Sequence, residues 1–238
     1  IHNLIAVDLL EHTSDSIVIQ DFLDIDSTTV KKIVRRLDIL IQTMLVDSKN
    51  TYKKDLSNSL TKRDQDVNRL SILANRIVNY YLENPERIKP DQPLKKIFQF
   101  QAISDHLERL ADESKRIARV WKVVKAPKTF HKKIETIYSL IEKCYSQVMR
   151  AYYVNDEELA FKVSKNIREN VILACDKLLE EARTKESAIV LEKLKTMGNY
   201  VRIIARNIYD YTEETFKKEE LTNNWRQEDG TIPQTKTT

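Results

Sequence analysis

Apolar residues recur every three to four positions along six stretches of the chain, the spacing of amphipathic helices. The first stretch keeps i, i+3, i+4 and i+7 spacing from about residue 30, after a capping region at 26–29. The second and third predict helices over about 61–83 and 94–124. Asn84-Pro85 ends the second helix and Ala126-Pro127 ends the third, because proline cannot continue a helix.

Three more helical patterns follow this proline break. They begin near residue 130, after 155–156 and near 186. Because the two halves repeat three helices of similar length in the same order, we predict an internal duplication. The expected fold is all-α, with two tandem three-helix bundles covering 25–125 and 126–220. Residues 221–238 lose the periodicity and predict a flexible polar tail.

The N-terminal residues 1–24 have a different pattern. Residues 15–20 are rich in β-branched side chains and bounded by turn formers, which predicts one strand or a short extended arm. A lone strand is not stable, so we expect it to pair outside this chain or to pack on the helices. Together with a first residue, Ile1, that is not methionine, this suggests a remnant of an upstream domain.

The amino-acid composition supports the prediction of a helical fold and argues against several kinds of function. Only 2 glycines are present, which leaves few positions for the tight turns of sheets or for a phosphate-binding loop. A formal net charge of +4 is too small to indicate nucleic-acid binding alone. Cys144 and Cys175 lack metal-ligand spacing and favour a reducing compartment. With no signal peptide and no run of about 18 apolar residues, we expect a cytoplasmic protein without membrane insertion.

The third predicted helix contains the most informative motif, the ExxxD element from Glu108 to Asp112. The second predicted helix contains the segment 63–70, which is similar to an acidic motif but has Asn68 where an acid is usual. The segment 34–47 lies in the first predicted helix. In these elements, and in its duplication, the chain resembles the PhoU family of phosphate-uptake regulators over about residues 20–217. The segment 34–47 resembles the first helix of archaeal PhoU-like regulators.

The resemblance implies a metal site formed by Asp64, Asn68, Glu108 and Asp112. Glu108 and Asp112 are four positions apart and share one helix face, beside the apolar stripe. Carboxylate and amide oxygens that converge between neighbouring helices suit a divalent or trivalent ion, such as iron, zinc, manganese or magnesium. The alternative is that these acids are only solvent-exposed residues at the border of the apolar face of amphipathic helices.

In the second repeat, arginines stand where the first repeat has its acids: Arg168, Arg202 and Arg206. Three basic side chains cannot hold a cation, so we expect that the second metal site is lost. Guanidinium groups suit phosphate or carboxylate, which suggests an anion-binding or partner-binding surface. The alternative is that they pair with acids such as Glu169 on adjacent helices.

A basic run without any acid spans the junction of the repeats, from 115 to 133. Lys122, Lys125 and Lys128 lie at its centre. One reading is a docking surface for an acidic partner, or weak contact with nucleic acid. The other is a solvated helix end, where cations are favoured by the helix dipole.

The function that the resemblance implies is regulation of phosphate uptake or phosphate homeostasis through metal-dependent protein binding. The partner would be a phosphate transporter or a signalling component, and pairing with a second copy stays open. DNA would be bound only through an upstream domain, as in archaeal transcription regulators of this type. No catalytic arrangement is recognisable, so we do not expect an enzyme. The alternatives are a helical adaptor without metal and a metal-dependent hydrolase.

Overall fold

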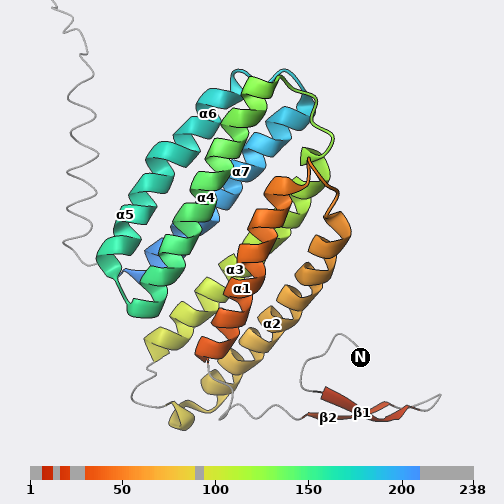
Figure 1. The fold of residues 1–238 in the computed structure, drawn as a ribbon. Coiled ribbons are helices and arrows are strands. Elements are labelled where there is room, and N and C mark those ends of the chain that lie inside the picture. The colour runs from red at the N-terminus through yellow and green to blue at the C-terminus, as the bar shows by residue number, and fades with distance from the viewer. Residues whose placement is uncertain (1–6, 13–16, 22–29, 89–93, 210–238) are drawn as a thin grey trace, which may run out of the picture.

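The computed structural model describes residues 7–12, 17–21, 30–88 and 94–209 of the 238-residue chain. The predicted six helical segments are confirmed (Figure 1). Their bounds are α1 Val30–Asn50, α2 Ser57–Glu83, α3 Leu94–Trp121, α4 Lys128–Val154, α5 Glu157–Ile167 with α6 Leu173–Leu179, and α7 Lys185–Ile208. A short 3₁₀ turn, η1 (Pro85–Arg87), follows α2. The expected cap at 26–29 and the expected tail at 221–238 lie outside the described residues.

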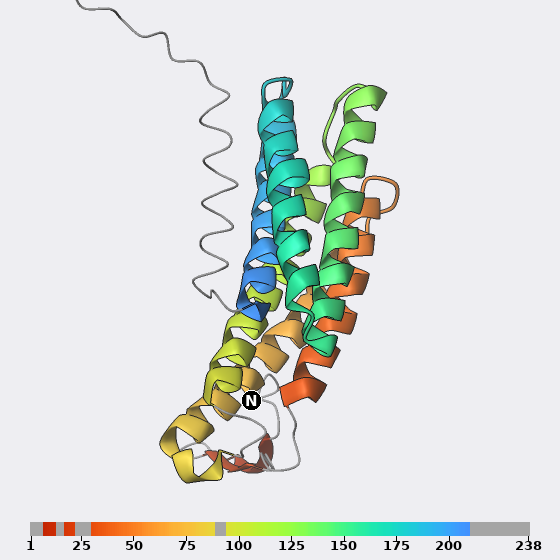
Figure 2. The same ribbon diagram turned by 90° about the vertical axis from the view of Figure 1, so that its left-hand side faces the viewer.

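The helices form two layers. Helices α2, α3, α7 and α5 lie side by side in one layer, and α1 and α4 cover one face of it (Figures 1 and 2). The contact between α3 and α7, one helix from each repeat, is the most extensive between any two helices. The two three-helix units therefore share one continuous apolar core. Whether they are separate domains with the expected boundaries stays a prediction.

Polar groups also join the repeats, where α1 packs against α4. The buried carboxylate of Asp38 accepts hydrogen bonds from the hydroxyls of Tyr145 at 3.0 Å and Tyr153 at 2.8 Å. Gln42, one turn along α1, donates a third at 2.9 Å. Burial, and then the adjacent carboxylate, raise the pKa of Tyr145 well above its ordinary value, so it remains a donor. This buried, satisfied cluster fixes the register of α1 on α4.

Local sequence explains where the second-repeat helices begin and end. Asn155 follows α4 in the left-handed conformation (φ 56°), which asparagine tolerates better than most residues. Asp156 then accepts a hydrogen bond at 2.8 Å from the backbone nitrogen of Leu159 and caps α5. Thr184 and Ser187 form a capping box at the start of α7.

The helix pair α5 and α6 is continuous through a π-helical turn, η2 (Arg168–Ile172). Gly198 of α7 faces this turn. A Cβ at position 198 would lie 2.9 Å from Cγ1 of Val171, so only glycine allows α7 to approach this closely. Helical periodicity alone did not predict the extra residue of this turn.

The N-terminal segment corrects one expectation. The strand predicted at 15–20 is β2 (Ile17–Asp21), but its partner is β1 (Val7–His12) of the same chain, in an antiparallel hairpin. The sequence alone predicts instead a partner outside the chain or packing on the helices. The alternation that marks β1 is interrupted by a register shift between Leu9 and Glu11, which hid the strand in the sequence.

Candidate functional site

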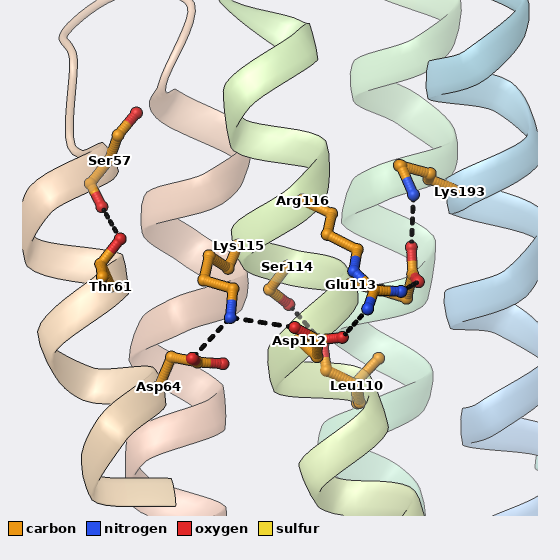
Figure 3. A network of polar contacts seen from close by, with 10 residues as sticks. All are labelled: Ser57, Thr61, Asp64, Leu110, Asp112, Glu113, Ser114, Lys115, Arg116 and Lys193. Carbon is orange, nitrogen blue, oxygen red and sulfur yellow. Dashed lines mark hydrogen bonds and ion pairs between the residues drawn. The ribbon is translucent and has the colours of Figure 1, made fainter. Parts of the chain in front are cut away.

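Two of the residues predicted to bind metal, Asp64 and Asp112, lie where α2 and α3 meet, on the face of the layer that α1 and α4 leave uncovered (Figure 3). Asp64 on α2 is buried, with 7% of its side chain exposed. Asp112 on α3 approaches it from the neighbouring helix. Glu108 is half-buried one turn away, and Asn68 is exposed. The structure therefore brings Asp64 of α2 and Asp112 of α3 together.

A lysine ammonium group lies between the two aspartates. Nζ of Lys115 is 2.5 Å from Oδ2 of Asp64 and 3.0 Å from Oδ1 of Asp112 (Figure 3). Burial alone would lower the pKa of Lys115, but the hydrogen bonds to both carboxylates outweigh it and the pKa is raised. The ammonium group is therefore charged at neutral pH and bridges α2 to α3.

The charges continue from α3 to α7. Arg116 contacts the second oxygen of Asp112 at 2.5 Å and Oε1 of Glu113 at 2.9 Å. Glu113 is buried, and its Oε2 accepts a hydrogen bond from Lys193 of α7 at 2.9 Å. We call this row the charge ladder; in order, it consists of Asp64, Lys115, Asp112, Arg116, Glu113 and Lys193 (Figure 3). It alternates in sign and crosses from the first repeat to the second.

The ladder contains residues that sequence reasoning missed. In the sequence, Lys115 and Arg116 belong to the basic run, and no motif marks Glu113 or Lys193. Part of the ladder was readable, because Asp112 is three residues before Lys115 and four before Arg116, both ion-pair spacings on a helix. The contacts with Asp64 and Lys193 join different helices, so they required the fold.

Within the part of the chain that the structure describes, no salt bridge involves Glu108. Burial, followed by the negative charge of Asp112, raises the pKa of Glu108 above its ordinary value. His106, on the same helix, donates from Nδ1 to the carbonyl oxygen of Ala102 at 2.6 Å, with its ring edge toward Tyr200. These contacts link His106 to its own helix and to α7.

The residues present do not fit a metal ion in this arrangement. The described part of the chain has no group of three or more histidine, cysteine, aspartate or glutamate side chains placed to hold one. Asp64 and Asp112 already bond to cationic side chains. The predicted metal, iron, zinc, manganese or magnesium, therefore stays a prediction that requires Lys115 to move away.

The arginines of the second repeat do not form a single exposed cluster. Arg202 and Arg206 lie one turn apart on α7, and Arg168 begins the π-helical turn. Arg168, Arg206 and the predicted alternative partner Glu169 each interact with at least one other residue. Arg206 also lines an open hollow of about 670 Å³ between α3 and α7, opposite Asp105. The anion-binding interpretation of these arginines stays a prediction.

The basic junction is more accessible. Lys125 and Lys128 are exposed, and no ion pair within the described residues involves either. Lys122 bonds to Asp55 at 2.9 Å. The neighbouring Val123 is 54% exposed. Lys125 also borders a hollow of about 460 Å³, whose other side is formed by the connection before α7, with Glu180, Glu181 and Arg183. Exposed cations beside an apolar side chain suit an acidic protein surface.

Both cysteines are buried and free. Burial raises the pKa of Cys144 to about 11 and of Cys175 to about 12, so neither forms a thiolate nucleophile at neutral pH. They pack as small core residues, as expected. No described helix is both long enough and apolar enough to cross a membrane.

The fold and the ladder define a two-repeat helical protein in which a row of alternating charges crosses α2, α3 and α7. Comparisons with known proteins agree with this class. Residues 22–120 match the family model described as the PhoU domain. No curated protein sequence matches the chain.

Two solved structures share the fold. The crystal structure of PhoU from Pseudomonas aeruginosa is similar with a TM-score of 0.65 and 18% identity, over 75% of this chain and 93% of that one. The phosphate transport system regulatory protein PhoU from Streptococcus pneumoniae is similar with a TM-score of 0.57 and 11% identity, over 75% and 92%. The chain therefore contains a PhoU domain, and the resemblance to the PhoU family predicted from the sequence is confirmed.

Proposed function

We propose that this protein regulates phosphate uptake, as PhoU proteins do, by binding a component of a phosphate transporter or of the signalling system coupled to it. The observation that carries the proposal is the match of 22–120 to the PhoU domain, within a fold that covers most of two PhoU structures. One of these structures is named as a regulatory protein of a phosphate transport system. Binding to a protein partner is the mode of action that a rigid bundle with polar surfaces can support.

The partner surface proposed here is the basic junction between the repeats. Lys125 and Lys128 are exposed cations without described ion pairs, and Val123 adds an exposed apolar contact. An acidic partner surface would be steered toward these lysines and then bury the valine. The arginines of α7 are the weaker candidates, because Arg206 is already engaged with other residues of the chain.

Two finer parts of the expected function remain predictions. Metal-dependent binding would require an ion to displace Lys115 from Asp64 and Asp112. A role in transcription regulation follows only from the resemblance to archaeal regulators. Both can be measured on the purified chain, by metal analysis and by binding to labelled promoter DNA.

Direct binding tests the proposal. The immobilised chain is titrated with the purified phosphate transporter of the same organism, and Lys125→Glu/Lys128→Glu is compared with wild type. A matched control, Lys31→Glu/Lys177→Glu, makes the same change in net charge at exposed sites elsewhere. We expect at least tenfold weaker binding for the junction variant and less than threefold for the control. Absence of binding by the wild type to any transporter or signalling component would contradict the proposed function.

A further inference from the structure

The ammonium group of Lys115 occupies the position between two carboxylates that a bound cation would take. It bonds to Asp64 at 2.5 Å and to Asp112 at 3.0 Å, and these residues belong to different helices (Figure 3). The remaining oxygen of Asp112 bonds to Arg116 at 2.5 Å. Asp112 thus has both oxygens bonded to cations of the chain itself.

We propose that Lys115 is a built-in cation that joins the acidic residues of α2 and α3 in place of a metal ion. The first repeat then holds its helix edge together without metal. This inference does not depend on the proposed function, because it concerns only what neutralises the acids.

Charge balance supports the proposal. Asp64, Asp112 and Glu113 contribute three negative charges, and Lys115, Arg116 and Lys193 contribute three positive charges, so the charge ladder is neutral as it stands. A divalent ion entering beside the ammonium group would be repelled by it at short range. The ion would also lack ligands, since hard cations take six or more oxygen donors and three of the four oxygens of Asp64 and Asp112 already bond to cationic side chains of the chain.

The position of the lysine makes it an effective substitute. Lys115 follows Asp112 by one helical turn, so the chain itself holds the ammonium group near the carboxylate. Its side chain is 17% exposed, and the Asp64 side chain that it reaches is 7% exposed. A tethered cation loses less freedom on pairing than a free ion, and it cannot be removed by a chelator.

Metal binding by three proteins tests the inference: wild type, Lys115→Ala and the control Lys122→Ala. Lys122 also bridges to an aspartate of the preceding α1–α2 connection, at 2.9 Å, but at the exposed surface. Each protein is dialysed with Mn²⁺, then measured by mass spectrometry for bound metal and by thermal unfolding with Mn²⁺ or EDTA.

For wild type and Lys122→Ala we expect no stoichiometric metal and the same melting temperature in both media. Lys115→Ala should unfold at a lower temperature in EDTA, bind Mn²⁺ at least tenfold more tightly than wild type, and regain stability with the ion. Adding Asp64→Asn should abolish that gain. Lys115→Met, which keeps most of the side-chain stem, provides the same comparison if the alanine variant does not fold.

Two results would overturn the inference. One is stoichiometric metal in the wild type that disappears in Asp64→Asn/Asp112→Asn. The other is a Lys115→Ala or Lys115→Met protein that is as stable as wild type in EDTA and binds no more Mn²⁺. Lys115→Arg, which keeps the positive charge, should behave like wild type.

Discussion

Replacing Glu113 by glutamine tests how strongly the charge ladder couples the two repeats. The substitution keeps the shape of the side chain and removes its charge. Glu113 is 8% exposed and receives one charged hydrogen bond from Lys193 of α7 and one from Arg116 of its own helix, each at 2.9 Å. Lys193 is thereby left beside a neutral amide that cannot balance its charge.

The size of the effect follows from burial. Removing one partner of a fully buried pair costs about 3–5 kcal/mol, because the other charge stays buried and unpaired. Here Lys193 is 23% exposed and Arg116 is 53% exposed, so both cations can turn toward water. We therefore expect Glu113→Gln to lower the free energy of unfolding by about 2 kcal/mol. In a chain of this length that corresponds to a melting temperature lower by about 4–8 °C.

The assay is urea and thermal unfolding of a double-mutant cycle with Lys193→Met. The coupling free energy between the two positions should be about 1–2 kcal/mol. The control is the exposed pair of Glu158 and Lys162 on α5, where Glu158→Gln should change stability by less than about 0.5 kcal/mol. A coupling free energy indistinguishable from zero at Glu113 and Lys193 would refute the reasoning that the ladder holds α3 to α7.

Three further predictions concern individual side chains. Because the pKa of Glu108 is raised in the folded protein, ionisation of this carboxyl group opposes folding. Glu108→Gln should therefore raise the melting temperature at pH 7. This gain should vanish as the pH falls below the ordinary pKa range of glutamate, where the carboxyl group is neutral in both states. Cys144 and Cys175 should react with a thiol reagent only as fast as the protein unfolds, and rapid labelling in buffer would argue against their burial. Gly198→Ala should destabilise the protein by up to about 2 kcal/mol, because the added Cβ would be too close to Val171. In a Val171→Ala background the contact is absent, and the same substitution should stabilise the protein by about 1 kcal/mol through the higher helix propensity of alanine, as measured by urea unfolding.

The helical architecture could be read from the sequence because each helix presents its own apolar face. The predicted second helix began at 61 and the observed one begins at Ser57, and both end at Glu83 before Asn84-Pro85. The repeat could be recognised because proline breaks and periodicity act locally. The π-helical turn could not, because its extra residue is accommodated by Gly198 on another helix.

The candidate site was only partly predictable. The ExxxD motif located Glu108 and Asp112, and the fold brings Asp112 toward Asp64 as expected. The identity of the cation between them depends on how far one long side chain reaches across a helix pair. Lys115 was read as part of a basic run because a linear sequence does not show which charges meet.

Asp38 provides a similar example. It lies next to Leu37 within the apolar stripe of α1, a position where an acid is costly unless hydrogen-bonded. That conflict was visible in the sequence. Its resolution by Tyr145 and Tyr153, more than 100 residues away on α4, required the structure.

The most direct test of the central claim is the rate of phosphate uptake in cells of the source organism. Labelled phosphate is supplied to wild-type cells, to cells lacking this protein, and to the latter carrying a restored copy, each grown with abundant and with limiting phosphate. We predict that loss of the protein changes how the uptake rate responds to phosphate supply and that the restored copy reverses the change. Identical uptake in all three strains under both conditions would contradict a role in phosphate regulation.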